Sequence, residues 1–445
     1  MRTWFGTDGI RGRSNELLTG EFVFQLGQAA GSFFNKKQKN PVIVIGRDTR
    51  LSSSMIEHAL AAGLMSVGVN VASLGVIPTP GVAYETKINK YTAGVVISAS
   101  HNPFEDNGIK FFHQTGYKLS DMEEEEIESY MKNPASILLA PPKGMGQMVK
   151  PRSGHDDYIT FLKKNRATRL DGLHMVVDSA NGAASAYAAK LFEDLGARVT
   201  AIHQQPNGTN INDQCGSTHL ASLQEMVRSK KADLGIALDG DADRLMVVDE
   251  MGNVVDGDDL LYIFATQMRK ESMLSSNTVV VTIMSNYGFI KALEEAGIDV
   301  RLTAVGDRYV IEEMKQGSYN LGGESSGHLI FGDKNTTGDG MMAALELVHA
   351  LVENGKPLST LTHGYQKSAQ VMNNVKVTNK KNWEQNDAIA RAIEKANKTL
   401  AGKGRILVRA SGTEELIRVM AEGPDREELN HIVFEISQVV LEHCS

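Results

Sequence analysis

Apolar runs and helix-like segments alternate along most of the chain. Three apolar runs each end in a polar turn, at residues 42–50, 174–182 and 278–286. Each run is followed by a segment in which apolar residues recur at helical spacing, as they do in 289–296. The pattern therefore predicts three strands, each followed by a helix.

A second and a third apolar run complete each of these blocks. The second runs lie at 70–75, 198–203 and 299–305, and the third runs, with the loops that follow, at 93–103, 232–244 and 319–328. Alternating strands and helices are typical of mostly parallel sheets that are covered on both faces. We interpret the blocks as three related α/β domains with mostly parallel mixed sheets, although unrelated α/β units can share this pattern by chance.

The last part of the chain has a different pattern. Residues 404–423 read as a strand, a glycine-containing loop and a second strand. Pro424, Asp425 and Glu428 then form a capping-box start to a helix. One face of that helix is apolar and comprises Leu429, Ile432, Val433, Ile436 and Val440. We expect a small α+β C-terminal domain here, and domain ranges of 1–150, 151–252, 253–366 and 367–445.

Composition narrows the class of protein. With 445 residues, 42% of them hydrophobic and 22% charged, the chain fits a soluble multidomain protein. Its net charge of −8 argues against nucleic-acid binding. The two cysteines, Cys215 and Cys444, give no disulfide framework and favour a reducing cytoplasm. Residues 1–8 lack the apolar core of a signal peptide, and we expect no membrane partner, because the uncharged segment 59–84 contains polar residues and two prolines.

Three carboxylates follow the third apolar run of the second block. Asp239, Asp241 and Asp243 stand at alternate positions and would repel one another unless a cation lay among them. All-oxygen ligation favours a hard ion, magnesium or calcium. An EF-hand is excluded because Arg244 occupies the position of its central glycine and no helix precedes the loop. A solvated acidic turn is the simpler alternative to a metal site.

Other polar loops offer further chemistry. Residues 98–103 contain two serines, which end a strand or supply a nucleophile. The loop 322–328 carries a carboxylate, hydroxyls and His328, suited to sugar hydroxyls, although a lone histidine is usually structural. In the tail, residues 409–413 and Arg418 offer two guanidiniums and two hydroxyls, apt for a phosphate dianion. A plain glycine turn is the alternative there.

These motifs, together with residues 5–12, resemble those of the α-D-phosphohexomutases. The motifs occur in the family's order and span essentially the whole chain. The resemblance implies four domains around a central cleft, three of them related. The domains would carry, in order, a phosphoserine loop, a metal loop, a sugar-binding loop and a phosphate clamp.

The resemblance also implies a role for each motif residue. Ser100 would carry a phosphate, and Asp239, Asp241 and Asp243 would hold one Mg²⁺ per chain together with an oxygen of that phosphoserine. The other catalytic residues would be Arg11, His101, Lys110, Arg244 and His328. Glu324 and Ser326 would bind the sugar, and the phosphate clamp would comprise Arg409, Ser411, Gly412, Thr413 and Arg418. We expect Lys110 and His328 to transfer protons with the sugar hydroxyls.

The chain departs from the family pattern at three positions. Ala242 stands where the metal loop usually has glycine, which narrows the backbone conformations open to it. Ala410 and Glu415 replace residues that are more often lysine and proline. A lost positive charge and an added negative one near a phosphate site would weaken binding, although neither position matches a phosphate ligand.

The closest resemblance within the family implies an amino-sugar substrate. The enzyme would interconvert glucosamine 6-phosphate and glucosamine 1-phosphate through a 1,6-bisphosphate, which also acts as activator, and would feed UDP-N-acetylglucosamine synthesis for the cell envelope. Phosphomannomutase/phosphoglucomutase activity is the nearest alternative. An Asp-nucleophile phosphatase or a non-catalytic sugar-phosphate sensor are the others. We expect a cytoplasmic monomer or homodimer that binds a small-molecule amino-sugar phosphate and no nucleic acid.

Overall fold

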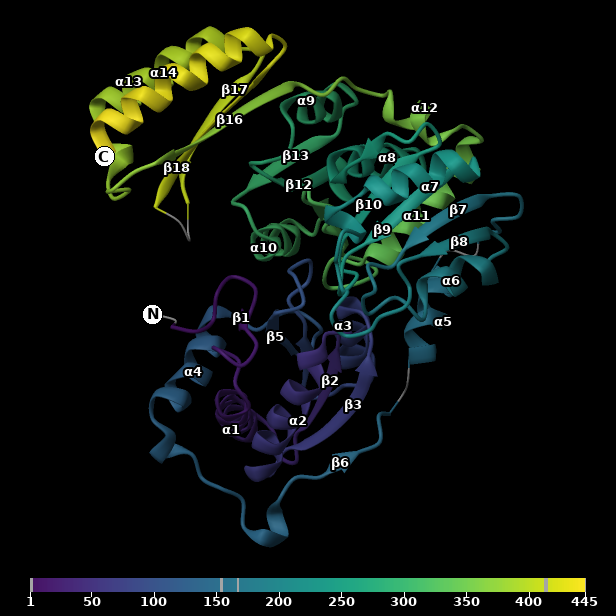
Figure 1. The fold of residues 1–445 in the computed structure, drawn as a ribbon, viewed down its shortest axis with the longest axis vertical. Helices are drawn as coiled ribbons and strands as arrows, with labels where there is room; N and C mark the ends of the chain where they lie inside the picture. Colours follow the sequence, from purple (N-terminus) through teal and green to yellow (C-terminus); the bar gives the residue numbers. More distant parts are fainter. Residues whose placement is uncertain (1–2, 153–154, 166–167, 412–414, 445) are drawn as a thin grey trace. The chain divides into compact units, whose positions relative to one another are not determined.

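The chain folds into two compact units. The computed structural model describes residues 3–152, 155–165, 168–411 and 415–444. One unit comprises residues 1–283 with 301–362, and the other comprises 284–300 with 363–445 (Figure 1). Short 3-10 turns add to the regular elements at Pro134–Ser136, Pro142–Gly144, Gly216–Thr218, Ser275–Asn277 and Trp383–Gln385.

A six-stranded mixed sheet is built by the first part of the chain. Its strands are β1 (Ile10–Arg13), β2 (Val42–Arg47), β3 (Asn70–Val76), β4 (Ala93–Ile97), β5 (Asp106–His113) and β6 (Met148–Val149), in the order β1-β5-β4-β2-β3-β6. β2 pairs in parallel with β3 and β4, whereas β5 is antiparallel to β1 and β4. The helices are α1 (Gly20–Lys37), α2 (Leu51–Ser66), α3 (Thr79–Ile88) and α4 (Asp121–Lys132).

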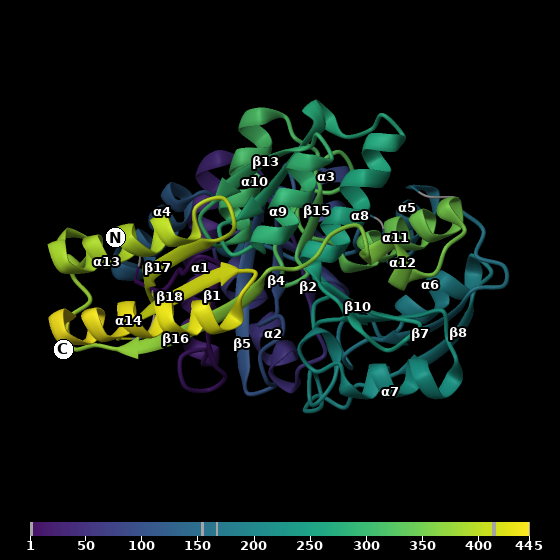
Figure 2. The same ribbon diagram turned by 90° about the horizontal axis from the view of Figure 1, so that it is seen from above.

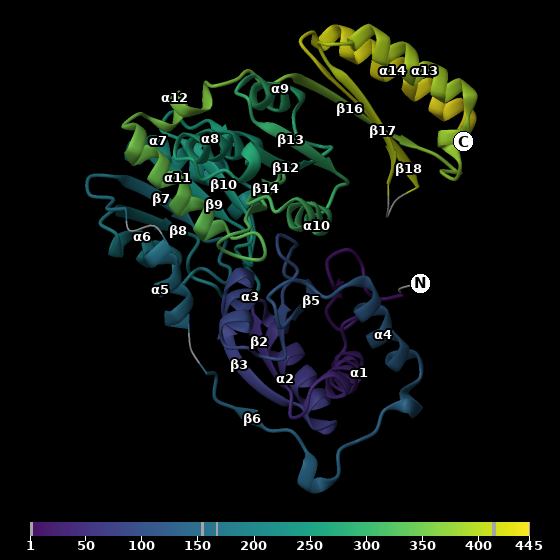
Figure 3. The ribbon, with the colours of Figure 1, turned by 180° about the vertical axis from the view of Figure 1, so that it is seen from behind.

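Helices α1 and α2 pack closely against each other beside this sheet (Figure 3). Gly27 and Gly63 lie where the two helices meet, and a side chain on either glycine would collide with the backbone of the other helix. Glycine is required at such an approach because it has no Cβ. The crossing buries Val23, Leu26, Phe33, Leu60 and Leu64 in one hydrophobic core with the sheet.

A five-stranded sheet follows, in the order β11-β10-β9-β7-β8. Its strands are β7 (His174–Asp178), β8 (Arg198–Ile202), β9 (Leu234–Leu238), β10 (Leu245–Asp249) and β11 (Val254–Val255). Its helices are α5 (His155–Asn165), α6 (Ala188–Asp194) and α7 (Ala221–Lys230). β7 pairs in parallel with β8 and β9, and β10 is antiparallel to β9, so the loop between β9 and β10 lies at the carboxyl ends of the parallel strands.

The third sheet has four strands, in the order β13-β12-β14-β15. They are β12 (Thr278–Thr282), β13 (Asp299–Thr303), β14 (Leu321–Gly323) and β15 (Leu329–Phe331), and the helices of this part are α8 (Gly257–Lys270), α10 (Asp307–Gly317), α11 (Gly340–Asn354) and α12 (Leu358–Thr362). Asp256 caps α8 and forms a capping box with Asp259. Asp339 caps α11 by accepting a hydrogen bond from Met342 N–H.

The second unit contains α9 (Tyr287–Glu295) and a three-stranded antiparallel sheet in the order β16-β18-β17. Its other elements are β16 (Ala369–Lys376), β17 (Arg405–Ala410), β18 (Leu416–Gly423), α13 (Asp387–Leu400) and α14 (Arg426–Cys444). Helices α13 and α14 lie side by side along this sheet (Figures 1 and 2). The Asp425 carboxylate accepts the N–H of Glu427 and of Glu428, and the apolar face predicted for α14 is buried.

The fold class predicted from the sequence is confirmed. The first, second and third strands of the three blocks are β2, β3 and β4, then β7, β8 and β9, then β12, β13 and β14. The uncharged segment 59–84 forms the end of α2, all of β3 and the start of α3. Within the described ranges, no helix is long and apolar enough to cross a membrane.

Candidate active site

Loops from all three α/β sheets of the first unit line a cleft of about 580 Å³. The residues that contribute charge or hydroxyl groups to it include Asp8, Arg11, Ser100, Lys118, Asp243, Arg244, Asp307, Glu324 and His328. Ligands of α/β proteins collect at the carboxyl ends of the strands, and Ser100, Asp243 and Glu324 each follow such an end. The cleft therefore collects the three loops that the sequence analysis singled out in this unit.

Ser100 is buried at the turn after β4 and has a left-handed backbone with φ of +54°. Its Oγ donates a hydrogen bond to Asp239 Oδ2 at 2.5 Å. Its N–H donates to Ser98 Oγ at 3.0 Å, and Ser98 Oγ in turn donates to Asp48 Oδ2 at 2.7 Å. Ser98 therefore supports the turn, while Ser100 presents its hydroxyl to the acidic loop.

His101 lies beside the Ser100 hydroxyl, with Nδ1 at 3.3 Å from Oγ. Burial and the neighbouring charges of Arg244 and Arg11 lower the pKa of His101 to about 4. A neutral imidazole is therefore present at this position near neutral pH.

The three aspartates of the β9–β10 loop are buried and converge. Asp239, Asp241 and Asp243 can each offer a carboxylate oxygen within 4.8 Å of the others, so the group can hold a metal ion. Asp241 Oδ1 and Asp243 Oδ1 are buried and have no hydrogen-bond partner among the described residues. Burial, followed by the charges of the other two aspartates, raises the pKa of Asp239 well above its ordinary value. Crowded, unsatisfied oxygens of this kind fit a hard divalent cation.

The loop also shows how the chain accommodates Ala242. This alanine has φ of +56°, in the left-handed region that favours glycine. The Ala242 N–H donates to the Asp239 carbonyl at 3.0 Å, and its own carbonyl accepts the Gly340 N–H at 3.0 Å. Alanine in place of glycine therefore leaves the hydrogen bonds of the 239–243 loop in place, although the backbone at Ala242 is strained.

Lys110 places a buried ammonium among these carboxylates. Its Nζ lies 3.1 Å from Asp8 Oδ2, 3.3 Å from Asp241 Oδ2 and 3.7 Å from Asp243 Oδ2. Burial alone would lower the pKa of Lys110, but the carboxylates around it raise that pKa above its ordinary value. Lys110 is therefore a cation at this site.

Two arginines complete the basic side of the cleft. Arg11 forms an ion pair with Asp8, and Arg244 directs its backbone N–H to Asp239 Oδ1 at 3.2 Å. The Nε atoms of both arginines are buried and have no hydrogen-bond partner among the described residues. Two unsatisfied guanidinium donors in a cleft with Ser100 fit an anionic group such as phosphate.

The loop between β14 and β15 carries the residues predicted to contact a sugar. Glu324 Oε1 accepts the Gly306 N–H at 3.1 Å, and Ser326 Oγ donates to Glu324 Oε2 at 3.4 Å. His328 Nε2 accepts the Gly338 N–H at 3.2 Å, and its Nδ1 lies 3.7 Å from Asp243 Oδ2. His328 thus lies next to the aspartate loop between β9 and β10. Both Glu324 and His328 line the cleft.

Several residues of the site had no role in the sequence analysis. Lys118 forms ion pairs with Asp8 and, at 2.6 Å, with Asp307. Thr79, at the start of α3, donates from Oγ1 to Asp241 Oδ2 at 2.6 Å. Asp8 stands in the motif at 5–12, so only its pairing was missed, whereas Lys118, Asp307 and Thr79 carried no distinguishing pattern.

The predicted phosphate clamp belongs to the second unit. Arg409 and Arg418 are paired across β17 and β18, and burial followed by the charge of Arg418 lowers the pKa of Arg409. Paired like charges are suited to an anion between them. Glu415 forms an ion pair with Lys380 at 3.2 Å, so its negative charge is balanced locally.

The rest of the clamp lies around the tip of these strands. Ser411 is buried, and its backbone carbonyl accepts a hydrogen bond from Lys380 Nζ at 3.0 Å. Gly412 and Thr413 lie outside the described residues.

Comparison with known protein families assigns most of the chain to one family. The chain matches the phosphoglucomutase/phosphomannomutase family in four consecutive parts: α/β/α domain I at residues 2–137, domain II at 156–252, domain III at 256–368 and the C-terminal domain at 372–439. The chain belongs to this family. Ser100, the aspartate loop and the loop with Glu324 thus fall in domains I, II and III respectively.

Individual relatives agree with this assignment. The chain is 50% identical to the phosphoglucosamine mutase of Brevibacillus brevis over 99% of both chains. It is also 50% identical to the phosphoglucosamine mutase of Bacillus subtilis, over 99% of this chain and 98% of that one.

Solved structures share the fold at lower identity. A phosphoglucomutase/phosphomannomutase family protein from Burkholderia thailandensis has a TM-score of 0.84 at 22% identity and covers 99% of this chain and 98% of its own. The N-acetylphosphoglucosamine mutase of Aspergillus fumigatus, solved with GlcNAc-6P and magnesium, has a TM-score of 0.71 at 17% identity, covering 100% of this chain and 96% of its own.

Proposed function

We propose that this enzyme is a phosphoglucosamine mutase, which interconverts glucosamine 6-phosphate and glucosamine 1-phosphate with Ser100 as the phosphate carrier. The observation that carries the proposal is the position of Ser100 Oγ, 2.5 Å from Asp239 in a buried loop of three aspartates. A hydroxyl beside carboxylates that can hold a divalent cation suits phosphoryl transfer, which depends on positioning and on neutralisation of charge. The relatives at 50% identity support the amino-sugar substrate.

The acidic loop fits a resident Mg²⁺. Asp239, Asp241 and Asp243 would hold the ion together with an oxygen of phosphorylated Ser100, because hard cations prefer oxygen ligands. When bound, Mg²⁺ supplies positive charge that offsets the negative charge of the phosphoryl group in transfer.

Ser100 would donate and then recover a phosphoryl group. In the first half, its phosphate passes to O1 of glucosamine 6-phosphate: the P–O bond to Ser100 breaks, O1 loses its proton, and Ser100 Oγ gains one. The resulting 1,6-bisphosphate turns end for end, Ser100 Oγ loses its proton and takes the phosphate from O6, and O6 regains a proton. We propose that Lys110 and His328 transfer these protons, and that Lys110, a cation in the resting site, acts first as a donor.

The basic residues of the cleft would position the phosphoryl group. Arg11 and Arg244 have unsatisfied Nε donors, and Lys110 adds a buried positive charge, so all three would neutralise the group during transfer. Glu324 and Ser326 would bind sugar hydroxyls. Arg11 and Lys110 are held by ion pairs with Asp8, so little reorganisation of these two groups is needed during the reaction.

The tail would hold the phosphate that does not react in a given half-reaction. Arg409, Ser411, Gly412, Thr413 and Arg418 would form this clamp, which must accept substrate, bisphosphate and product alike. The product would serve UDP-N-acetylglucosamine synthesis. We propose a cytoplasmic enzyme that is a monomer or a homodimer. We retain domain boundaries near residues 150, 252 and 367 as part of this proposal.

A direct comparison of substrates tests the proposal. Glucosamine, mannose and glucose 6-phosphates would be offered to the purified enzyme with Mg²⁺ and a catalytic amount of a hexose 1,6-bisphosphate. We expect kcat/KM to be highest for glucosamine 6-phosphate. Higher values for mannose or glucose phosphate would favour the phosphomannomutase/phosphoglucomutase alternative, and release of inorganic phosphate without isomerisation would favour a phosphatase.

A further inference from the structure

The turn that presents Ser100 is held by donor groups of two side chains, one from domain I and one from domain II. The Ser100 carbonyl accepts hydrogen bonds from Arg50 Nη2 and from Asn212 Nδ2, each at 2.9 Å. The Asn102 carbonyl accepts from the same two groups, at 2.9 and 3.1 Å. Because Ser100 is not glycine, its φ of +54° is strained and must be maintained by such contacts.

Arg50 holds the turn from within domain I. Its side chain is fully buried, and its Nε donates to Asp48 Oδ2 at 2.8 Å. Its Nη1 donates to the Pro103 and Asp106 carbonyls, so a single guanidinium binds four carbonyls of residues 100–106. These contacts of Arg50 all lie within domain I and involve no residue of domain II.

Asn212 reaches the turn from domain II. It is buried in the segment between β8 and α7 and has φ of +57°. Its N–H donates to the Ala180 carbonyl at 2.9 Å, which ties the segment to the loop after β7. The amide group of Asn212 therefore joins domain II to the backbone of the residue that we propose to carry the phosphate.

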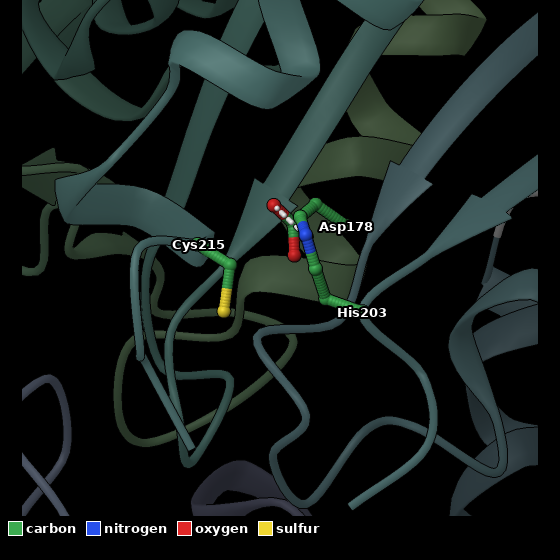
Figure 4. Close-up of side chains that lie close together, drawn as sticks. All are labelled: Asp178, His203 and Cys215. Carbon is green, nitrogen blue, oxygen red and sulfur yellow. Dashed lines mark ion pairs between the residues drawn. The ribbon is translucent and has the colours of Figure 1, made fainter. Parts of the chain in front are cut away.

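At the two ends of the segment that carries Asn212, the side chains of Asp178, His203 and Cys215 lie close together (Figure 4). Asp178 Oδ1 accepts the Ala180 N–H at 2.8 Å, and Oδ2 accepts the Gly216 N–H at 3.0 Å and lies 3.0 Å from His203 Nδ1. These contacts occupy both oxygens of the Asp178 carboxylate. Burial raises the pKa of the Cys215 thiol to about 12, so the thiol is neutral near pH 7. The cluster therefore fixes both ends of the segment 203–216.

We propose that Asn212 is a positioning residue for Ser100, and that its amide makes the placement of the phosphate-carrying serine depend on domain II. The inference rests on the proposed function for its effect on turnover, but the contact itself does not. Without the amide, Arg50 alone would hold the two carbonyls, and Ser100 Oγ would sample positions away from Asp239 and from the reacting phosphate. Misplacement of a reacting atom by about 1 Å lowers rates by about a hundredfold.

Asn212→Gly is the informative variant. Glycine adopts positive φ without strain, so the substitution removes the side chain and spares the backbone. Asn40→Gly is the matched control, because Asn40 also has positive φ, 51°, but is exposed on the surface. Asn212→Ala, which removes the amide and keeps a Cβ that the chain accommodates at a similar φ in Ala242, serves as a second variant.

Four quantities would be measured for each protein: kcat, KM for glucosamine 6-phosphate, the unfolding temperature, and amide hydrogen exchange of the segment 98–106. For both Asn212 variants we expect kcat to fall about ten- to a hundredfold with KM within about twofold of the parent. Exchange in 98–106 should accelerate while the unfolding temperature stays within a few degrees. Asn40→Gly should match the parent in every quantity.

Two results would overturn the inference. One is an Asn212→Gly enzyme whose kcat and exchange in 98–106 equal those of the parent. The other is faster exchange throughout the domains in proportion to a lowered unfolding temperature, which would indicate a general loss of stability. A parent enzyme without mutase activity would instead refute the proposed function, and the exchange measurement would still decide whether Asn212 holds the turn.

Discussion

Replacing Thr79 by valine should weaken metal binding without touching any proposed metal ligand. Thr79 Oγ1 donates to Asp241 Oδ2 at 2.6 Å, and its N–H donates to the Asp241 carbonyl at 2.9 Å. Both side chains are buried, so water does not replace the lost hydroxyl. Valine has the same shape and retains the backbone contact, which isolates the side-chain hydrogen bond.

The magnitude follows from that one bond. A hydrogen bond to a charged group contributes about 1.5–3 kcal/mol, and about 1.4 kcal/mol corresponds to a tenfold change in affinity. Residues that orient a metal ligand commonly change metal affinity by about ten- to a hundredfold. We therefore expect Thr79→Val to bind Mg²⁺ and Mn²⁺ about ten- to a hundredfold more weakly than the parent.

Titration calorimetry with each metal, in the absence of substrate, provides the measurement. Thr79→Ser is the control, because serine keeps the hydroxyl donor, and its affinity should lie within a few-fold of the parent. Equal metal affinity in the parent and Thr79→Val would refute the role of Thr79. A loss of affinity as large in Thr79→Ser would show that packing, not the hydroxyl, matters.

Four further predictions follow from the site and its surroundings. Ser100→Ala should abolish turnover, whereas Ser98→Ala should lower kcat less than about tenfold, because Arg50 and Asn212 still hold the Ser100 carbonyl; equal losses in a kinetic assay would contradict the assignment. Asp241→Asn, or chelation by EDTA, should lower activity by orders of magnitude, since an anionic ligand or the metal itself is lost; full activity in chelator would exclude a metal requirement. Arg418→Ala should weaken binding of glucosamine 6-phosphate and 1-phosphate alike by about ten- to a hundredfold, as calorimetry would show, and a defect for one of the two would argue against a shared clamp. Burial raises the pKa of Asp339 to about 6, so the folded state binds its proton more tightly than the unfolded state does; the free energy of unfolding should therefore fall by up to about 3 kcal/mol as pH rises from about 4 to 6, and urea titrations of Asp339→Asn should lack this slope.

The repeated strands and helices could be predicted from sequence because local periodicity carries them. Buried strands such as β4, β9 and β14 are short apolar runs bounded by polar turns, and that pattern is visible without any tertiary information. The aspartate loop was equally visible, since three alternating carboxylates after an apolar strand repel one another unless a cation lies among them. The central cleft was implied by the family resemblance, and the loops after β4, β9 and β14 meet there because each lies at the carboxyl end of its strand.

The contacts that hold the site could not be predicted in the same way. Asn212 and Ser100 are separated by 112 positions in sequence, and Thr79 and Asp241 by 162. Thr79 lies between two prolines and repeats with no period, and Asn212 is one of many polar residues in 204–219. Nothing local distinguishes either residue from its neighbours. Such residues become visible only when the fold brings distant loops together.

Arg47 and Arg50 illustrate the same limit over three positions of sequence. Arg47 is the last residue of β2, and Arg50 lies in the turn that follows it. In the structure Arg47 pairs with Glu57 of α2 at 2.8 Å, and Arg50 binds the Ser100 turn. The two arginines have different partners because their side chains leave the backbone in different directions. The residue types do not specify those directions.

Transfer of a labelled phosphate from Ser100 to glucosamine 6-phosphate would test the central claim most directly. The enzyme would be labelled with a radioactive hexose 1,6-bisphosphate, freed of excess label, mapped by peptide mass spectrometry, and mixed with unlabelled glucosamine 6-phosphate and Mg²⁺. The account predicts that the label maps to Ser100 and then moves within one turnover into glucosamine phosphates. Label that maps to another residue, or that stays on the protein while glucosamine 1-phosphate forms, would contradict it.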